Sequence, residues 1–111
     1  MSNVIADSCL LRIEATGVPP GAVLECVGEI DLSCVDTLRR ALAAAIRSGA
    51  PEVVVDLRAV SFLDSSAMEA LSEAHRQLAP AGRALRVRAR PWAAHLLHMV
   101  QLDRAFTVQT D

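Results

Sequence analysis

The spacing of apolar and polar positions changes several times along the chain, and each change predicts a new element. From Cys9 to Ala15 the two kinds alternate, which is typical of a half-buried strand, here expected at the edge of a sheet. A turn cluster over 17–21 separates it from a second strand, Ala22 to Val27, that returns beside the first as a hairpin. Gly28-Glu29-Ile30-Asp31 closes this second strand.

Three segments instead place apolar residues three or four positions apart, which predicts amphipathic helices. The first is capped by Asp31 or Ser33 and ends at Gly49. The second stops at Pro80, and the third opens at Pro91. The residues expected to face the core are Val35, Leu38, Leu42, Ala45 and Ile46 in the first helix, Ala67, Leu71, Ala74 and Leu78 in the second, and Trp92, Leu96, Met99 and Val100 in the third.

Three more strands are predicted between and after these helices. The segment Pro51 to Leu57 contains Val53-Val54-Val55, a continuous apolar run that favours a central strand covered on both faces, followed by a turn at Ala59-Val60. Ala84 to Ala89 alternates again, and Phe106 to Val108 forms a short final strand or extended tail. Strands that alternate with helices imply parallel pairs. We therefore expect one α/β domain over residues 1–111, with two layers, a mixed four- to five-stranded sheet and helices mainly on one face.

Composition narrows the class of protein. The 111 residues carry a net charge of -2, and aromatic residues make up only 3%, too few for a nucleic-acid surface that stacks bases. The longest membrane-like stretch, Pro91 to Leu102, is shorter than the ~20 residues of a spanning helix. Three cysteines without metal-pair spacing, and an N-terminus without a leader pattern, favour a reduced, cytoplasmic protein. Neither nucleic acid nor membrane is expected as a partner.

The segment from Asp56 to Leu71 is the most informative about function. Ser66 and Glu69 have the spacing of a capping box at the start of the second helix. Alternatively Asp64 is the N-cap, and Ser65 and Ser66 occupy the first turn. In either register at least one serine hydroxyl is free, at a helix N-terminus that stabilises a phosphate by about 0.3–1 kcal/mol.

Several motifs together resemble the STAS domain of bacterial anti-sigma factor antagonists. They are Gly28-Glu29-Ile30-Asp31, the valine-rich strand ending in Asp56-Leu57, Ser61-Phe62-Leu63-Asp64-Ser65-Ser66 and Leu102-Asp103-Arg104-Ala105-Phe106, which extend over nearly the whole chain. The resemblance implies a STAS-like fold and a non-enzymatic regulator of transcription, active in sigma factor regulation and stress response. Such a protein binds an anti-sigma factor that is itself a serine kinase, and thereby frees the sigma factor.

The resemblance also implies site residues and partners. The kinase phosphorylates Ser65, a serine phosphatase reverses the modification, and the partner-binding residues are Asp31, Asp64, Ser65, Ser66, Ala67 and Met68. No cofactor and no metal are implied, and the protein is a monomer or weak homodimer. Members of the family usually have glycine where this chain has Ala67, and an apolar or small residue where it has Glu69.

Other hypotheses find less support in the residues. One alternative is a STAS scaffold or transport-accessory subunit that is never phosphorylated. A serine hydrolase lacks the G-x-S-x-G elbow, and His75 lies about 15 Å along the same helix from Ser65. A nucleotide-binding module lacks a glycine-rich loop, and His95 with His98 lacks further metal ligands. The arginines at 83, 86, 88 and 90 are expected to pair with Glu14 or Glu25 on a solvated face, or to meet an acidic partner.

Overall fold

The computed structural model describes residues 3–8, 10–17 and 22–110, the first of these ranges by its backbone alone. The strands form one sheet in the order β1-β2-β3-β4-β5-β6, antiparallel from β1 to β3 and parallel from β3 to β6. The elements are β1 Asn3–Ser8, β2 Leu11–Thr16, β3 Val23–Ile30, α1 Val35–Arg47, β4 Glu52–Leu63, α2 Ser65–Leu78, the short 3-10 helix η1 Ala79–Ala81, β5 Ala84–Ala89, α3 Pro91–Met99, the 3-10 helix η2 Leu102–Arg104 and β6 Thr107–Thr110.

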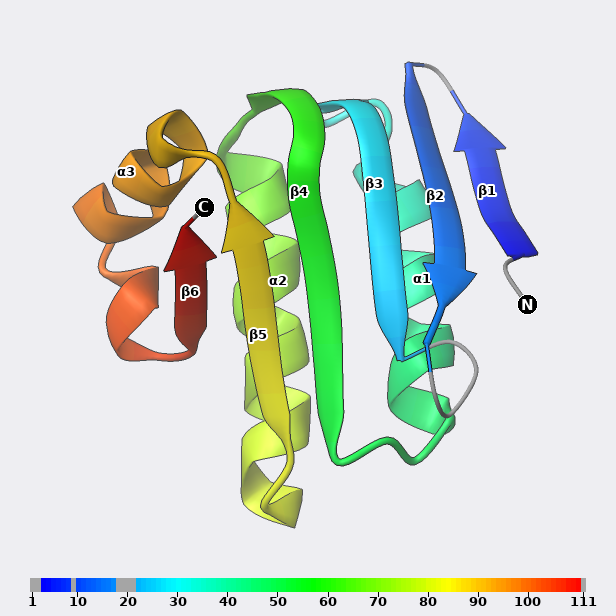
Figure 1. Ribbon diagram of the computed structural model, residues 1–111, viewed down its shortest axis with the longest axis vertical. Coiled ribbons are helices and arrows are strands. Elements are labelled where there is room, and N and C mark those ends of the chain that lie inside the picture. The colour runs from blue at the N-terminus through cyan, green and yellow to red at the C-terminus, as the bar shows by residue number, and fades with distance from the viewer. Residues whose placement is uncertain (1–2, 9, 18–21, 111) are drawn as a thin grey trace.

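The layering confirms the predicted α/β class. Helices α1 and α2 lie side by side behind the sheet, α3 lies beside the β5 and β6 edge, and the face in front of β2, β3 and β4 is open (Figure 1). The sheet has six strands rather than four or five: β6 is the possible final strand of the prediction, and β1 is a further strand that was not predicted. The hairpin of β2 and β3 is confirmed, but β2 is not an edge strand, since β1 pairs along its outer side. The predicted start of that strand, Cys9, lies outside the described residues.

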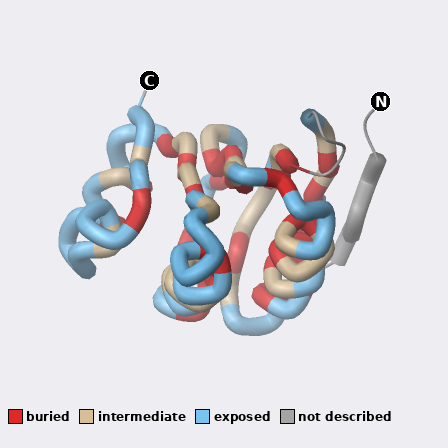
Figure 2. Tube along the Cα trace, turned by 90° about the horizontal axis from the view of Figure 1, so that it is seen from below, coloured by how far each residue is buried: buried red, intermediate tan, exposed pale blue. Residues whose placement is uncertain are grey.

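The core lies between the sheet and the two long helices, where the buried positions gather (Figure 2). The predicted inward stripe of α2 is confirmed, with all four residues at most 3% exposed. In α1 the stripe is also buried, except that Ile46 lies at the edge of the core. The stripe predicted for α3 is wrong: Ala93 and Leu97 are buried, whereas Trp92, Met99 and Val100 are exposed. A helix packed at the edge of a sheet buries only a narrow face, so several apolar residues remain outside.

Strand β4 is longer than its apolar run suggests. It continues through the predicted turn at Ala59-Val60 and ends at Leu63, because β3 runs beside it as far as Ile30. The run is not covered on both faces. Val53 and Val55 are fully buried, but Val54 between them is only half-buried on the open face of the sheet.

Gly28 lies where β3 passes close to the backbone just before β2. Its φ is +114°, and a Cβ on this residue would lie 1.7 Å from the carbonyl oxygen of Leu10. The next amide, of Glu29, donates to that same oxygen at 2.9 Å. Only glycine fits so close to the neighbouring backbone in this conformation. On its other side β3 pairs with β4, and the two strands end together, with Ile30 opposite Leu63.

Candidate functional site

The paired ends of β3 and β4 bring two loops to one edge of the sheet. The amide of Asp64 donates to the carbonyl oxygen of Ile30 at 3.2 Å, and α2 begins at the next residue. On the other side, residues 31–34 form the turns that lead into α1. The predicted site residues at 31 and 64–68 therefore lie next to each other, although more than 30 positions separate them in the sequence.

Asp64 joins these two loops through its carboxylate. One oxygen, Oδ1, accepts from the Ser66 amide at 2.9 Å and from the Ser66 hydroxyl. The other, Oδ2, accepts from the Leu32 amide at 3.0 Å. The Ser66 hydroxyl bond, assisted by the Ser66, Ala67 and Leu32 amides, holds the pKa of Asp64 below its usual value despite some desolvation. Asp64 is thus an ionised N-cap that also fastens the opposite loop.

This arrangement decides between the two registers left open for α2. Asp64 is the N-cap, with the extended backbone of such residues, and Ser65 and Ser66 are the first two helical residues. The predicted capping box of Ser66 with Glu69 is wrong, because Ser66 lies within the first helical turn and its amide donates to the Asp64 carboxylate. Ser66 is 7% exposed, whereas Ser65 is exposed. Among the described residues, none makes a hydrogen bond to the Ser65 hydroxyl.

Asp31 stabilises its own turn rather than α1. Its Oδ1 accepts from the Ser33 hydroxyl at 2.6 Å and from the Ser33 amide at 3.0 Å, and these bonds lower its pKa. The N-cap of α1 is Cys34, which makes no capping bond with its side chain. The prediction of Asp31 or Ser33 as the cap was wrong, because the turn extends the loop by one residue. Asp31 is half-buried at the rim of the site.

The remaining predicted residues differ in their access to solvent. Ala67 is fully buried, with 0% exposure, while Met68 on the next position is partly buried against the core. Sequence reasoning missed two apolar neighbours, Leu32 at 76% and Phe62 at 46% exposure. The signal for Leu32 was present: it is a large apolar residue between polar ones in a turn, where no core position is expected.

Arg83 and Arg86, two of the arginines after α2, bind groups other than the predicted Glu14 and Glu25. Arg83 donates from Nε to the Ala50 carbonyl and from Nη2 to the Ile46 carbonyl, each at 2.8 Å, and so satisfies the C-terminal end of α1. Arg86 pairs with Glu52 at 2.8 Å. These arginines connect elements of the fold, and they lie away from Ser65.

A second charged group lies on the open face of the sheet. Arg58 binds Asp56 through two side-chain bonds, of 3.0 and 2.8 Å. Burial alone would raise the pKa of Asp56, but Arg58 lowers it below its usual value, with help from Arg88 on β5. Behind this pair, burial and the charge of Asp56 raise the pKa of Cys26 to about 12, so its thiol is protonated and unreactive at neutral pH.

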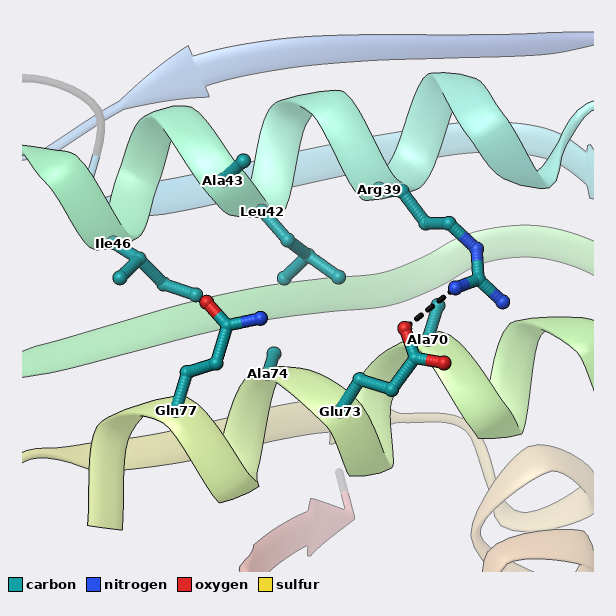
Figure 3. Close-up of a pocket in the computed structure, with 8 residues that line it drawn as sticks. All are labelled: Arg39, Leu42, Ala43, Ile46, Ala70, Glu73, Ala74 and Gln77. Carbon is teal, nitrogen blue, oxygen red and sulfur yellow. Dashed lines mark hydrogen bonds and ion pairs between the residues drawn. The ribbon is translucent and has the colours of Figure 1, made fainter. Parts of the chain in front are cut away.

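The cleft between α1 and α2 does not have the dimensions of a small-molecule site. Figure 3 shows Arg39 and Glu73 pointing toward each other across it, where they form an ion pair. The cleft measures about 90 Å³, whereas ligand pockets usually reach ~300 Å³ or more. No group of three His, Cys, Asp or Glu that could hold a metal occurs among the described residues. In the same part of the chain, no helix is long and apolar enough to cross a membrane.

The architecture is therefore a two-layer α/β domain with an exposed serine at the start of its second helix. The chain matches the STAS domain model over residues 12–111, and it belongs to the STAS domain family. It is similar to the crystal structure of an anti-sigma factor antagonist from Mycobacterium paratuberculosis, with 31% identity and a TM-score of 0.73. That match covers 78% of this chain and 74% of the other. No match was found among curated protein sequences.

Proposed function

We propose that this protein is an anti-sigma factor antagonist, and that phosphorylation of Ser65 by the anti-sigma factor, a serine kinase, switches it off. The observation that carries the proposal is the contrast between two neighbours: Ser66 is buried and bonded to Asp64, whereas the Ser65 hydroxyl is exposed and unbonded among the described residues. The similarity to an anti-sigma factor antagonist supports the same role.

The unmodified protein binds the anti-sigma factor with the edge formed by Asp31, Leu32, Asp64, Ser65 and Met68, and so frees a sigma factor. Ser66 and Ala67 belong to this site as its support, since both are buried beneath it. Their contribution is to hold Ser65 in the first turn of a helix. Glycine's conformational freedom is not needed at 67, because the residue is helical and its methyl group fills part of the core.

A phosphate on Ser65 acts on the partner more than on the fold. The N-terminus of α2 stabilises the added charge of about -1.5 to -2, while the ionised Asp64 beside it opposes that charge. The two effects act in opposite directions, so α2 stays folded. Two unit charges ~5 Å apart repel by ~3 kcal/mol at an effective dielectric near 20, about a hundredfold in affinity, so the phosphate would repel a partner carboxylate at that distance at least this strongly. A serine phosphatase restores the binding form.

We further propose that the protein is not an enzyme. His75 lies on α2 itself, and its ring packs on Phe106 with 6.0 Å between the centroids, so it does not activate Ser65. A hydrolase would need a base within hydrogen-bond reach of the nucleophile. Turnover of activated esters that disappears in Ser65→Ala would contradict this proposal.

The decisive experiment is phosphorylation by candidate anti-sigma factor kinases with ATP, followed by peptide mapping with mass spectrometry. We expect one phosphate on Ser65 in the wild type and none in Ser65→Ala. Thr107→Ala is the matched control, since it removes an exposed hydroxyl on β6, outside the proposed binding surface, and should leave labelling unchanged. If the protein binds such a kinase and is not labelled, the constitutive scaffold is correct and the switch is wrong.

A further inference from the structure

A groove on the outer side of α2 begins at Ser65. Its apolar lining comes from Met68 of α2 and from Val100 and Leu102, which follow α3. Met68 and Leu102 pack partly against the core, while Val100 is 51% exposed. Polar side chains occur along the α2 side only, as Ser65, Glu69 and Ser72. The groove therefore offers one apolar wall built from two elements that are distant in sequence.

The turn that carries this apolar wall has an unusual backbone. Gln101, between Val100 and Leu102, has φ +63°, the left-handed conformation that residues other than glycine rarely adopt. Hydrogen bonds fix it: the Gln101 amide donates to the His98 carbonyl at 2.9 Å, and His98 pairs with Asp103 at 2.8 Å. Strain that the surrounding bonds maintain is a feature of binding and catalytic sites. Here it places Val100 at the surface beside Met68 instead of beneath α3.

The charges along the groove restrict what can occupy it. Among the described residues that line the groove, Glu69 is the one charged residue, so an acidic side chain would be repelled. A basic side chain would be attracted, but it would be attracted more strongly once Ser65 carries a phosphate. An aliphatic side chain is stabilised by burial against the apolar wall. A phosphate on Ser65 would oppose its entry, because the phosphate dianion would lose hydrating water without gaining a hydrogen-bond partner.

We propose that this groove receives an aliphatic side chain of the anti-sigma factor, and that phosphate on Ser65 prevents its entry. This inference rests on the proposed function, and it adds the contact on which the switch acts. Ser65 belongs both to the groove and to the edge formed with Leu32 and Asp64, so the two are one continuous surface. At the groove, exclusion of this side chain adds to the charge repulsion that the phosphate exerts at the edge.

The test is isothermal titration of the purified anti-sigma factor that phosphorylates the wild-type chain. We expect Val100→Ser to weaken its binding about tenfold, since truncation of a central apolar contact has effects of this size. Val27→Ser is the matched control: Val27 is 50% exposed on the open sheet face, and its replacement should change Kd less than about twofold. Equal Kd values for the two variants would overturn the proposal.

A double-mutant cycle with Ser65→Asp tests whether the charge acts through the groove. We expect each single change to weaken binding about tenfold, and the double change to fall well short of a hundredfold, because both remove one contact. Fully multiplicative effects, or tighter binding of Ser65→Asp, would overturn the aliphatic occupant. If no anti-sigma factor binds the wild type, the proposed function itself fails. If the Val100→Ser variant binds the anti-sigma factor as tightly as the wild type does, only the proposal of the groove contact is overturned.

Discussion

The two long helices start side by side at the same edge of the sheet, yet their first turns are built differently. The N-cap of α2, Asp64, binds its helix with its side chain, whereas the N-cap of α1, Cys34, does not. Asp64 also holds the loop before α1 through the Leu32 amide. The Asp64 carboxylate thus stabilises the starts of both helices. The Ser65 hydroxyl makes no hydrogen bond among the described residues, so it does not support the fold. The contrast shows how a folded edge can keep a hydroxyl exposed for modification.

The largest effect should come from removing the carboxylate that serves both helices. We expect Asp64→Ala to lower the free energy of unfolding by about 1–2 kcal/mol, the usual cost of a lost N-cap. Asp31→Ala removes bonds within one turn only and should have a smaller effect. Urea denaturation followed by circular dichroism measures both. Equal losses in the two variants would show that Asp64 has no special role.

The second prediction concerns the residue at which this chain differs from the usual family pattern. Ala67→Gly should destabilise the protein by about 1 kcal/mol, because glycine lowers helix propensity and a buried methyl group is lost. Ala41→Gly, at an equally buried position within α1, is the matched control. Thermal unfolding of both variants gives the comparison. A Tm for Ala67→Gly at or above the wild-type value would mean that the alanine is not part of the core packing.

Features of this edge that depend on local sequence could be predicted, whereas features that depend on contacts between distant segments could not. The start of α2 and its inward stripe follow from local pattern, since Asp64, Ser65 and the apolar spacing occur within one short segment. Local pattern does not decide between Asp64 and Ser66 as the cap, because both residue types favour that position. The choice is decided by the pairing of β3 with β4, which brings the Leu32 amide to the Asp64 carboxylate.

The groove beside Ser65 could not have been predicted from local pattern at all. The spacing of apolar residues places Val100 on the inner face of α3, and the sequence gives no signal for the conformation of Gln101, because left-handed residues are usually glycine. Likewise, the sequence pattern ends β4 too early, since Ala59-Val60 resembles a turn until its pairing with the neighbouring β3 is known. Contacts between elements override propensity in each case.

The third prediction uses pH to distinguish the contribution of Asp64 to stability from that of Asp31 in the other loop. The folded protein lowers the pKa of Asp64, so this residue contributes stability above the usual value of 3.8 and loses it as pH falls through the lower, folded value. We expect the urea midpoint to decrease on acidification below about pH 4. Asp64→Asn should show a shallower decrease in that window. The remaining slope belongs mainly to Asp31 and Asp56, whose pKa values are lowered in the same way. Parallel curves for wild type and variant would contradict this assignment.

The smallest effect should come from the residue on which the proposed switch depends. Ser65→Ala should change the free energy of unfolding by less than about 0.5 kcal/mol, since the side chain is exposed and makes no hydrogen bond among the described residues. Ser66→Ala, one position along, should cost about 1 kcal/mol because it removes a bond to the Asp64 cap. Chemical denaturation of this pair compares two adjacent hydroxyls of the same helix turn. If Ser65→Ala proves the more damaging of the two, its hydroxyl has a structural task, and the modification would then act on the fold before it acts on a partner.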